Sequence, residues 1–256
     1  MKLMKKSSLL TLTVMILCIS LSITGSGQGN QKIRSFSKAK KFLHNVIFKS
    51  PEMRTFYCGC IYDSKLNIDH GSCGYIPGKE KKRAARVEWE HIVPASLFGG
   101  SSQEWRNGSP DCVDRLGRHF KGRKCASKMN SDFQLMQADM YNLVPSVGEI
   151  NAVRSDLSFG EIPGEKREFG ICDFEVDGKV AEPADRVKGD IARIYQYMDQ
   201  AYPGYGIISE KNRLMFEKWA ALDPADEKEC QRGLEIEKIQ GNGNPVLKKA
   251  CAQLVP

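Results

Sequence analysis

Arg86-Val87-Glu88-Trp89-Glu90-His91-Ile92-Val93-Pro94-Ala95 is the stretch of this 256-residue chain that decides the fold. Its β-branched and aromatic residues predict a strand over 86–93. Pro94 ends that strand, because proline lacks the backbone donor that a sheet needs. Glu90 and His91 therefore stand where the strand becomes a loop. We interpret them as a metal-binding carboxylate beside a general base.

A third polar residue, Asn142, lies 51 residues after His91. The segment from about Asp132 to Leu143 is predicted to be a helix, and it ends there because Pro145 disfavours helical geometry in the residue before it. A helix that carries Asn142 and faces the strand would complete a sparse polar site.

Hydrolysis of a phosphodiester requires an activated water, in-line geometry and neutralisation of charge on the phosphate and the leaving oxygen. Mg²⁺ prefers oxygen ligands and takes only one or two protein groups, which fits the carboxylate of Glu90 and the amide oxygen of Asn142. His91, with an ordinary pKa of about 6.5, can take a proton from water. Neighbours on a regular strand point to opposite faces, so we expect Pro94 to break the alternation and let Glu90 and His91 share one cleft.

Other residues near this site have simpler interpretations. A structural histidine is the alternative for His91, but its acidic neighbour favours the catalytic role. His44, His70 and His119 lack such neighbours, and we interpret them as surface or structural residues. Glu88 shares the face of Glu90 and could support the metal site, although an ordinary strand residue is the favoured interpretation.

The N-terminus has the features of an export signal. Three lysines precede an apolar run from Leu9 to Leu21, and small residues follow that run. The run is too short for a comfortable membrane span. We therefore predict a cleaved signal peptide over 1–27, rather than a retained anchor, and one domain over 28–256. The expected location is periplasmic or secreted, without membrane association.

Cleavage of this signal removes Cys18 and leaves eight cysteines. An even number in an exported protein predicts disulfides. Two pairs are expected as local loops, and two more join in an order that the sequence leaves open: Cys112–Cys125, Cys230–Cys251, and Cys58 and Cys60 with Cys73 and Cys172. The alternative is a zinc site from Cys58, Cys60 and Cys73, but a C-x-C spacing is shorter than zinc sites usually have.

The net charge is +7, from 38 Lys and Arg against 31 Asp and Glu. Without the three signal lysines, 35 basic and 31 acidic residues remain. Many of the basic residues gather between 79 and 124, around the strand that carries His91. Such residues bind phosphates without reading base sequence, so the cluster indicates a nucleic-acid surface, with a solvated basic surface as the alternative. No zinc-finger spacing indicates base-specific readout.

The rest of the chain predicts an α+β protein. Helices are expected over 37–48, 190–200, 209–221 and 229–240, a strand over 56–62, and a hairpin turn at Asp177-Gly178. Residues 77–86 and 99–123 are expected to be loops. No linker separates two domains, so we predict a single mixed domain with a mostly helical C-terminal part, held by disulfides.

Eight segments together resemble the bacterial endonuclease I family of periplasmic or secreted nucleases. They follow the order of that family from residue 56 to 245 and cover nearly the whole domain: FYCGC (56–60), SCGY (72–75), RVEWEHIVPASLFG (86–99), GRKCA (122–126), ADMYNLVPSVGEIN (138–151), RSD (154–156), GDIARIYQYM (189–198) and KIQGNGNP (238–245). The resemblance includes all eight cysteines.

This resemblance implies a ββα-metal core and a Mg²⁺-dependent endonuclease that cleaves DNA, and also RNA, without sequence specificity. Mn²⁺ or Ca²⁺ could replace Mg²⁺ in binding. His91 would activate water, Glu90 and Asn142 would hold the metal, and the protein would act as a monomer.

The family also uses an arginine after the strand to hold the phosphate. Where that arginine commonly precedes a cysteine, this chain has Pro110-Asp111, so Arg106 is the expected substitute and Arg115 the second choice. If the clamp were lost, the alternative would be a catalytically silent secreted protein that binds nucleic acid or serves as a disulfide scaffold.

Overall fold

The structure is a computed structural model, in which residues 29–49, 53–164, 166–252 and 254 are described. The expected signal peptide, 1–27, lies outside these residues. Within them, no helix combines the length and the apolar character that crossing a membrane requires.

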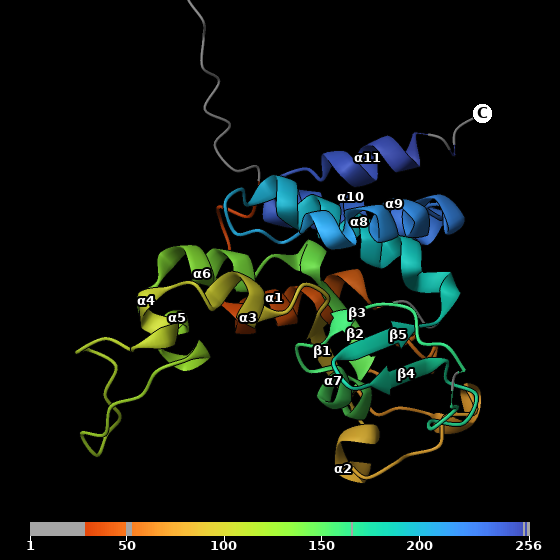
Figure 1. Cartoon of the computed structure of the whole chain (residues 1–256), viewed down its shortest axis with the longest axis horizontal. Helices are drawn as coiled ribbons and strands as arrows, with labels where there is room; N and C mark the ends of the chain where they lie inside the picture. Colours follow the sequence, from red (N-terminus) through yellow and green to blue (C-terminus); the bar gives the residue numbers. More distant parts are fainter. Residues whose placement is uncertain (1–28, 50–52, 165, 253, 255–256) are drawn as a thin grey trace, which may run out of the picture.

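A two-stranded sheet followed by a helix forms the centre of the fold (Figure 1). Strand β1 (Val87–His91) pairs antiparallel with β2 (Leu143–Val147), with Val87 opposite Val147 and His91 opposite Leu143. Helix α7 (Gly148–Arg154) follows β2 directly and packs against β1. The strand expected over 86–93 is confirmed, and with β2 and α7 it makes the expected ββα unit.

The helix predicted from Asp132 to Leu143 is confirmed only in its first half. Helix α6 (Ser131–Gln137) ends early, and a 3-10 turn (Met140–Asn142) leads into β2. The Asp139 side chain caps this turn by accepting a hydrogen bond from the backbone N–H of Tyr141. Pro145 lies within β2 itself, which a strand with only one sheet partner can tolerate.

A second, three-stranded sheet lies beside this unit, in the order β3-β5-β4. Its strands are β3 (Ser158–Phe159), β4 (Phe174–Asp177) and β5 (Val180–Pro183), and the hairpin at Asp177-Gly178 is confirmed. The strand expected over 56–62 is wrong. This segment is a tight turn closed by the backbone N–H of Thr55 on the carbonyl of Cys60, and Gly59 has a φ of +71° that few other residues adopt.

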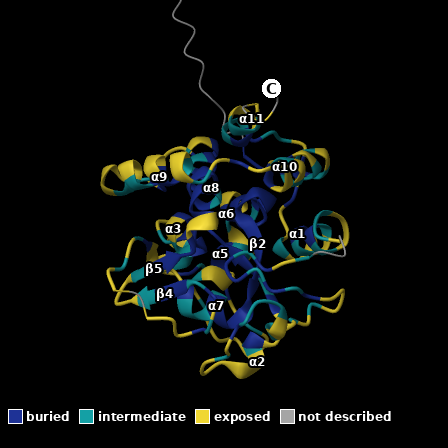
Figure 2. Ribbon diagram, turned by 90° about the vertical axis from the view of Figure 1, so that its right-hand side faces the viewer, coloured by how far each residue is buried: buried dark blue, intermediate teal, exposed yellow. Residues whose placement is uncertain are grey.

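Helices surround both sheets, and the buried residues concentrate between them (Figure 2). On the side of β1 and β2 lie α1 (Phe36–Phe42) with a π-helical turn (Leu43–Ile47), α2 (Lys81–Ala84), α3 (Ala95–Gly99), α4 (Gln103–Arg106), α5 (Arg123–Met129) and α6. The C-terminal layer holds α8 (Lys188–Ala201), α9 (Glu210–Leu222), α10 (Glu227–Gln240) and α11 (Pro245–Cys251). The predicted helical C-terminal third is confirmed. The segments expected as loops, 77–86 and 99–123, contain α2 and α4.

Four disulfides join the described cysteines. Cys112–Cys125 and Cys230–Cys251 are confirmed, and the open pairing resolves as Cys58–Cys172 and Cys60–Cys73. Because these sulfurs are bonded to one another, the zinc site considered for Cys58, Cys60 and Cys73 is excluded.

Candidate active site

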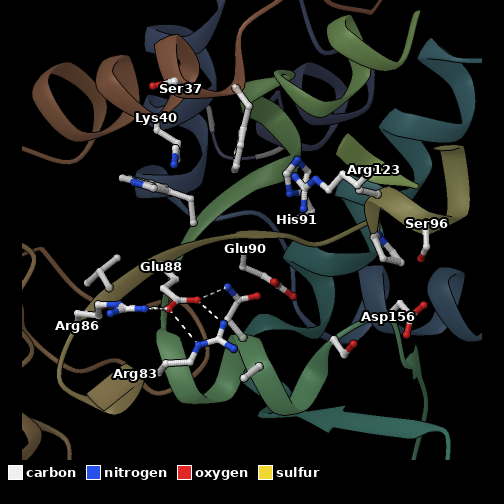
Figure 3. A pocket seen from close by; sticks show the side chains of 18 of the residues that line it. Ser37, Lys40, Arg83, Arg86, Glu88, Glu90, His91, Ser96, Arg123 and Asp156 are labelled. Carbon is white, nitrogen blue, oxygen red and sulfur yellow. Dashed lines mark hydrogen bonds and ion pairs between the residues drawn. The ribbon is translucent and has the colours of Figure 1, made fainter. Parts of the chain in front are cut away.

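One pocket gathers side chains from both sides of β1 (Figure 3). Its wall includes Glu88, Glu90 and His91 of β1, Asn151 of α7 and Arg123 of α5, with Lys40 and Lys41 of α1 near the rim. The expectation that Glu90 and His91 share one cleft despite strand alternation is confirmed. The chain leaves regular strand geometry directly after His91.

His91 is held in one tautomer. Its Nε2 lies 2.8 Å from the carbonyl oxygen of Gln137, which can only accept a hydrogen bond, so Nε2 carries the proton. The other ring nitrogen, Nδ1, is therefore the atom with a free lone pair. Burial, together with the nearby Arg123 cation, lowers the pKa of His91 to about 3, so the ring is neutral at pH 7. A neutral imidazole with one fixed lone pair is the state that a general base needs.

Glu90 is buried on the pocket wall and uses only one of its oxygens internally. Oε1 accepts hydrogen bonds from the guanidinium of Arg154 (2.9 Å) and the hydroxyl of Tyr57 (3.3 Å). Oε2 forms no hydrogen bond with any residue that the structure describes. Burial raises the pKa of Glu90 to about 7, although Arg154 and Tyr57 pull it down. The free oxygen is a hard donor of the kind that Mg²⁺ binds.

Asn142 does not lie on this wall. It is fully buried, and its amide is paired at both ends with one residue after the strand: Oδ1 accepts from the backbone N–H of Val93 (2.7 Å) and Nδ2 donates to the carbonyl of Val93 (2.9 Å). The amide thus fixes the chain just beyond His91. This placement does not fit the predicted role of Asn142 as a metal ligand.

Asn151 occupies the position that was expected for Asn142. It lies on α7, lines the pocket, and donates a hydrogen bond from Nδ2 to Oε2 of Glu88 (3.1 Å). Its Oδ1 has no hydrogen-bond partner among the described residues. Two hard oxygens, on Glu90 and Asn151, therefore line the pocket, and such a pair fits a single Mg²⁺ that keeps most of its waters. Within the described residues, no group of three or more His, Cys, Asp or Glu is placed so that it could hold a metal ion.

The arginine that lines the pocket near His91 is neither of the two that the sequence predicts to hold the phosphate. Arg106 is exposed and donates to the carbonyl of Ser101, and Arg115 lies in the connection between α4 and α5 that projects from the body in Figure 1. Neither lines the pocket. Arg123 does, and its guanidinium points toward His91 in Figure 3. It stacks on the ring of Phe36 at 5.2 Å and donates no hydrogen bond to the described chain, which leaves its fork available for a phosphate.

Arg154 is a component that the sequence reasoning missed. This fully buried residue donates to Oε1 of Glu90 and to the carbonyls of His91 and Ile92. It thereby holds the end of β1 in one conformation and balances the buried carboxylate. Asn151, Arg123 and Arg154 all lie within segments that match the family pattern (138–151, 122–126 and 154–156), so that pattern contains a signal for all three.

Comparison with known proteins agrees with this geometry. Residues 35–251 match the family described as Endonuclease I. The chain is 38% identical over 241 residues to an extracellular deoxyribonuclease of Aeromonas hydrophila, across 92% of this chain and 96% of the relative. It is 37% identical over 253 residues to a periplasmic deoxyribonuclease of the same species, across 96% and 99%. An Endonuclease-1 of Buchnera aphidicola is 37% identical over 224 residues, across 86% of this chain and 82% of the relative. The chain therefore belongs to the endonuclease I family and is an endonuclease.

Proposed function

We propose that this protein is a secreted or periplasmic, Mg²⁺-dependent nuclease that hydrolyses phosphodiester bonds of DNA, and of RNA, without sequence specificity. The observation that carries the proposal is the pocket in which the free Nδ1 of His91 and the uncommitted oxygens of Glu90 and Asn151 lie together. The names of the relatives support DNA as the substrate and the export of the protein. Cleavage of a signal over 1–27 and a monomeric state are part of the same proposal.

The residues divide the reaction among them. Oε2 of Glu90 and Oδ1 of Asn151 would hold the divalent ion, which when bound supplies positive charge to the phosphate and the leaving oxygen. His91 takes a proton from water at Nδ1, and the Gln137 carbonyl keeps the ring oriented through Nε2. Arg123 binds a non-bridging phosphate oxygen. Because Arg123 lines the pocket and can bind the phosphate, the missing arginine before Cys112 is no longer a reason to favour a catalytically silent protein.

Two asparagines test the proposal. Asn151→Ala should lower Mg²⁺-dependent plasmid cleavage by more than about 10²-fold, the scale of losing one preorganised polar group. Asn142→Ala should instead lower the free energy of unfolding by about 1–3 kcal/mol, since it leaves the backbone groups of Val93 unpaired. The measurements are cleavage rates over a Mg²⁺ titration, with an EDTA control, and urea unfolding curves.

The Mg²⁺ concentration for half-maximal rate separates the two roles. It should be unchanged in Asn142→Ala at a temperature where that variant is folded. If Asn142→Ala shifted this concentration while Asn151→Ala did not, the ligand would be Asn142, as the sequence alone predicted.

The pH dependence should follow the metal-binding carboxylate. The raised pKa of Glu90, about 7, means that protons compete with the metal below neutrality, whereas His91 stays unprotonated down to about pH 3. At subsaturating Mg²⁺, activity should therefore rise with pH through about 7. Once Mg²⁺ exceeds its dissociation constant, each further tenfold increase should move this acid limb down by about one pH unit. A limb that stays at the same pH over a hundredfold range of Mg²⁺ above that constant would show that another group controls it.

Two arginine variants should differ in the range of substrates that they affect. Arg123→Ala should slow cleavage of both plasmid DNA and a short chromogenic phosphodiester by about 10²-fold, because it contacts the reacting phosphate. Arg115→Ala should leave the short diester unaffected, weaken binding of long DNA, and reduce the salt slope of binding by about 1. Arg213→Ala on α9 is the matched control for loss of one surface charge. Equal losses for Arg115→Ala on both substrates would return Arg115 to the reaction centre.

A further inference from the structure

The side chain of Glu88 is surrounded by donors from two separate segments. It lies on β1 two residues before Glu90, so both carboxylates face the same pocket. Arg83 donates to both of its oxygens, and Arg86 donates to Oε1 from Nε (3.2 Å) and Nη2 (2.8 Å). Figure 3 shows the carboxylate held between these two guanidinium groups. A carboxylate bound by two permanent cations is ionised and can only accept hydrogen bonds.

The fifth donor to Glu88 is the amide of Asn151. Nδ2 of Asn151 lies 3.1 Å from Oε2 of Glu88. An amide has a donor end and an acceptor end of nearly equal size, and an acceptor-only neighbour fixes which end faces it. The Nδ2 end therefore faces Glu88, and Oδ1 is the end left for a ligand.

The approach of α7 to β1 makes this contact possible. Gly148 begins α7, three residues before Asn151 and on the same face of the helix. A Cβ atom built on Gly148 would lie 2.6 Å from the carbonyl oxygen of Arg83 and 3.0 Å from the side chain of Glu88. The absence of a side chain at Gly148 thus lets α7 pack directly on Glu88, and Asn151 comes within reach of the carboxylate.

We propose that Glu88, clamped by Arg83 and Arg86, is a positioning residue that orients the amide of Asn151 so that its oxygen faces the metal ion. This inference rests on the proposed role of Asn151 as a metal ligand. It also gives Arg83 and Arg86 a different task from the phosphate binding that their position in the basic cluster suggested, because the Nε and Nη2 groups of both are already used on Glu88.

Direct metal binding, without DNA, tests the proposal. Mn²⁺ binding to the whole purified protein would be measured by calorimetry for wild type, Glu88→Gln, Asn151→Ala and the double variant. Glu88→Gln should weaken Mn²⁺ binding about 10- to 100-fold, the usual effect of losing a partner that orients a metal ligand. Because Glu88 acts only through Asn151, adding Glu88→Gln to Asn151→Ala should cause no further loss.

If Glu88→Gln fails to fold, Glu88→Asp replaces it in the test. Aspartate keeps the negative charge, but its side chain is one methylene too short to accept the hydrogen bond from Asn151. Arg86→Ala is the matched control, because Arg83 still holds the carboxylate, and its effect should stay below about threefold. Wild-type Mn²⁺ affinity in Glu88→Gln or Glu88→Asp would overturn the proposal, and so would a loss that adds fully to that of Asn151→Ala. If Asn151→Ala itself bound Mn²⁺ normally, the ligand assignment would fail instead, which is a separate result.

Discussion

Replacing His91 by alanine should reduce DNA cleavage by about 10³-fold, within the range for removal of a general base. The loss follows from the geometry of the ring: Nδ1 is free to take a proton, and the other histidine on the pocket wall, His44, lies on the π-helical turn after α1 and not beside Glu90 on β1. Binding of DNA should remain largely intact, because Arg123 and the lysines of α1 are unchanged. Gel-shift affinity and single-turnover cleavage on the same duplex would measure the two effects.

The control for this variant is His119→Ala, which removes an exposed histidine from the connection between α4 and α5. It should cleave a short diester at the wild-type rate. Near-normal turnover by His91→Ala at saturating Mg²⁺ would remove the imidazole from the mechanism and leave metal-bound solvent as the base.

Replacing Arg154 by methionine should lower the free energy of unfolding by about 3–5 kcal/mol. The ion pair that it forms with Glu90 is 0% and 3% exposed, so solvent cannot screen the orphaned carboxylate. The carbonyls of His91 and Ile92 also lose their donor. Urea denaturation at neutral pH would show the change in stability, and circular dichroism would confirm that the variant folds at low temperature.

Two comparisons isolate the cause. Adding Glu90→Gln to Arg154→Met should recover part of the lost stability, because the buried negative charge disappears. Arg193→Met removes another buried arginine, paired with Glu229 in the C-terminal layer, and should cost similar stability while the site stays intact. If Arg154→Met were as stable as wild type, the guanidinium would not be neutralising Glu90 in the folded protein.

The sequence predicts β1 and the long C-terminal helices well, because their periodicity is clear. It misplaces the elements between them for identifiable reasons. The strand β2 is hidden by Pro145, which normally ends a helix and argues against a strand, and α7 is only seven residues long. The tight turn at 56–60 alternates like a strand but closes on itself through Thr55 and Cys60.

The candidate site shows the same limit. Glu90 and His91 are adjacent in the sequence, so local pattern finds them. The choice between Asn142 and Asn151 depends on which amide faces solvent and which is paired with Val93, and that depends on where β2 starts. The sequence favours Arg106 over Arg123 as the phosphate-binding residue for a similar reason. Only the packing of α5 brings Arg123 into the pocket that His91 lines.

Tyr57 links two features of the molecule. Its hydroxyl reaches Glu90, and its neighbours in the chain, Cys58 and Cys60, are tied to Cys172 and Cys73. If the protein is exported as we propose, the newly made polypeptide lacks these covalent ties in the reducing interior of the cell, and the turn that carries Tyr57 would be free to move away from the carboxylate. We expect full activity to mature only after oxidation, so that the genome of the producing cell is spared while the molecule is in transit.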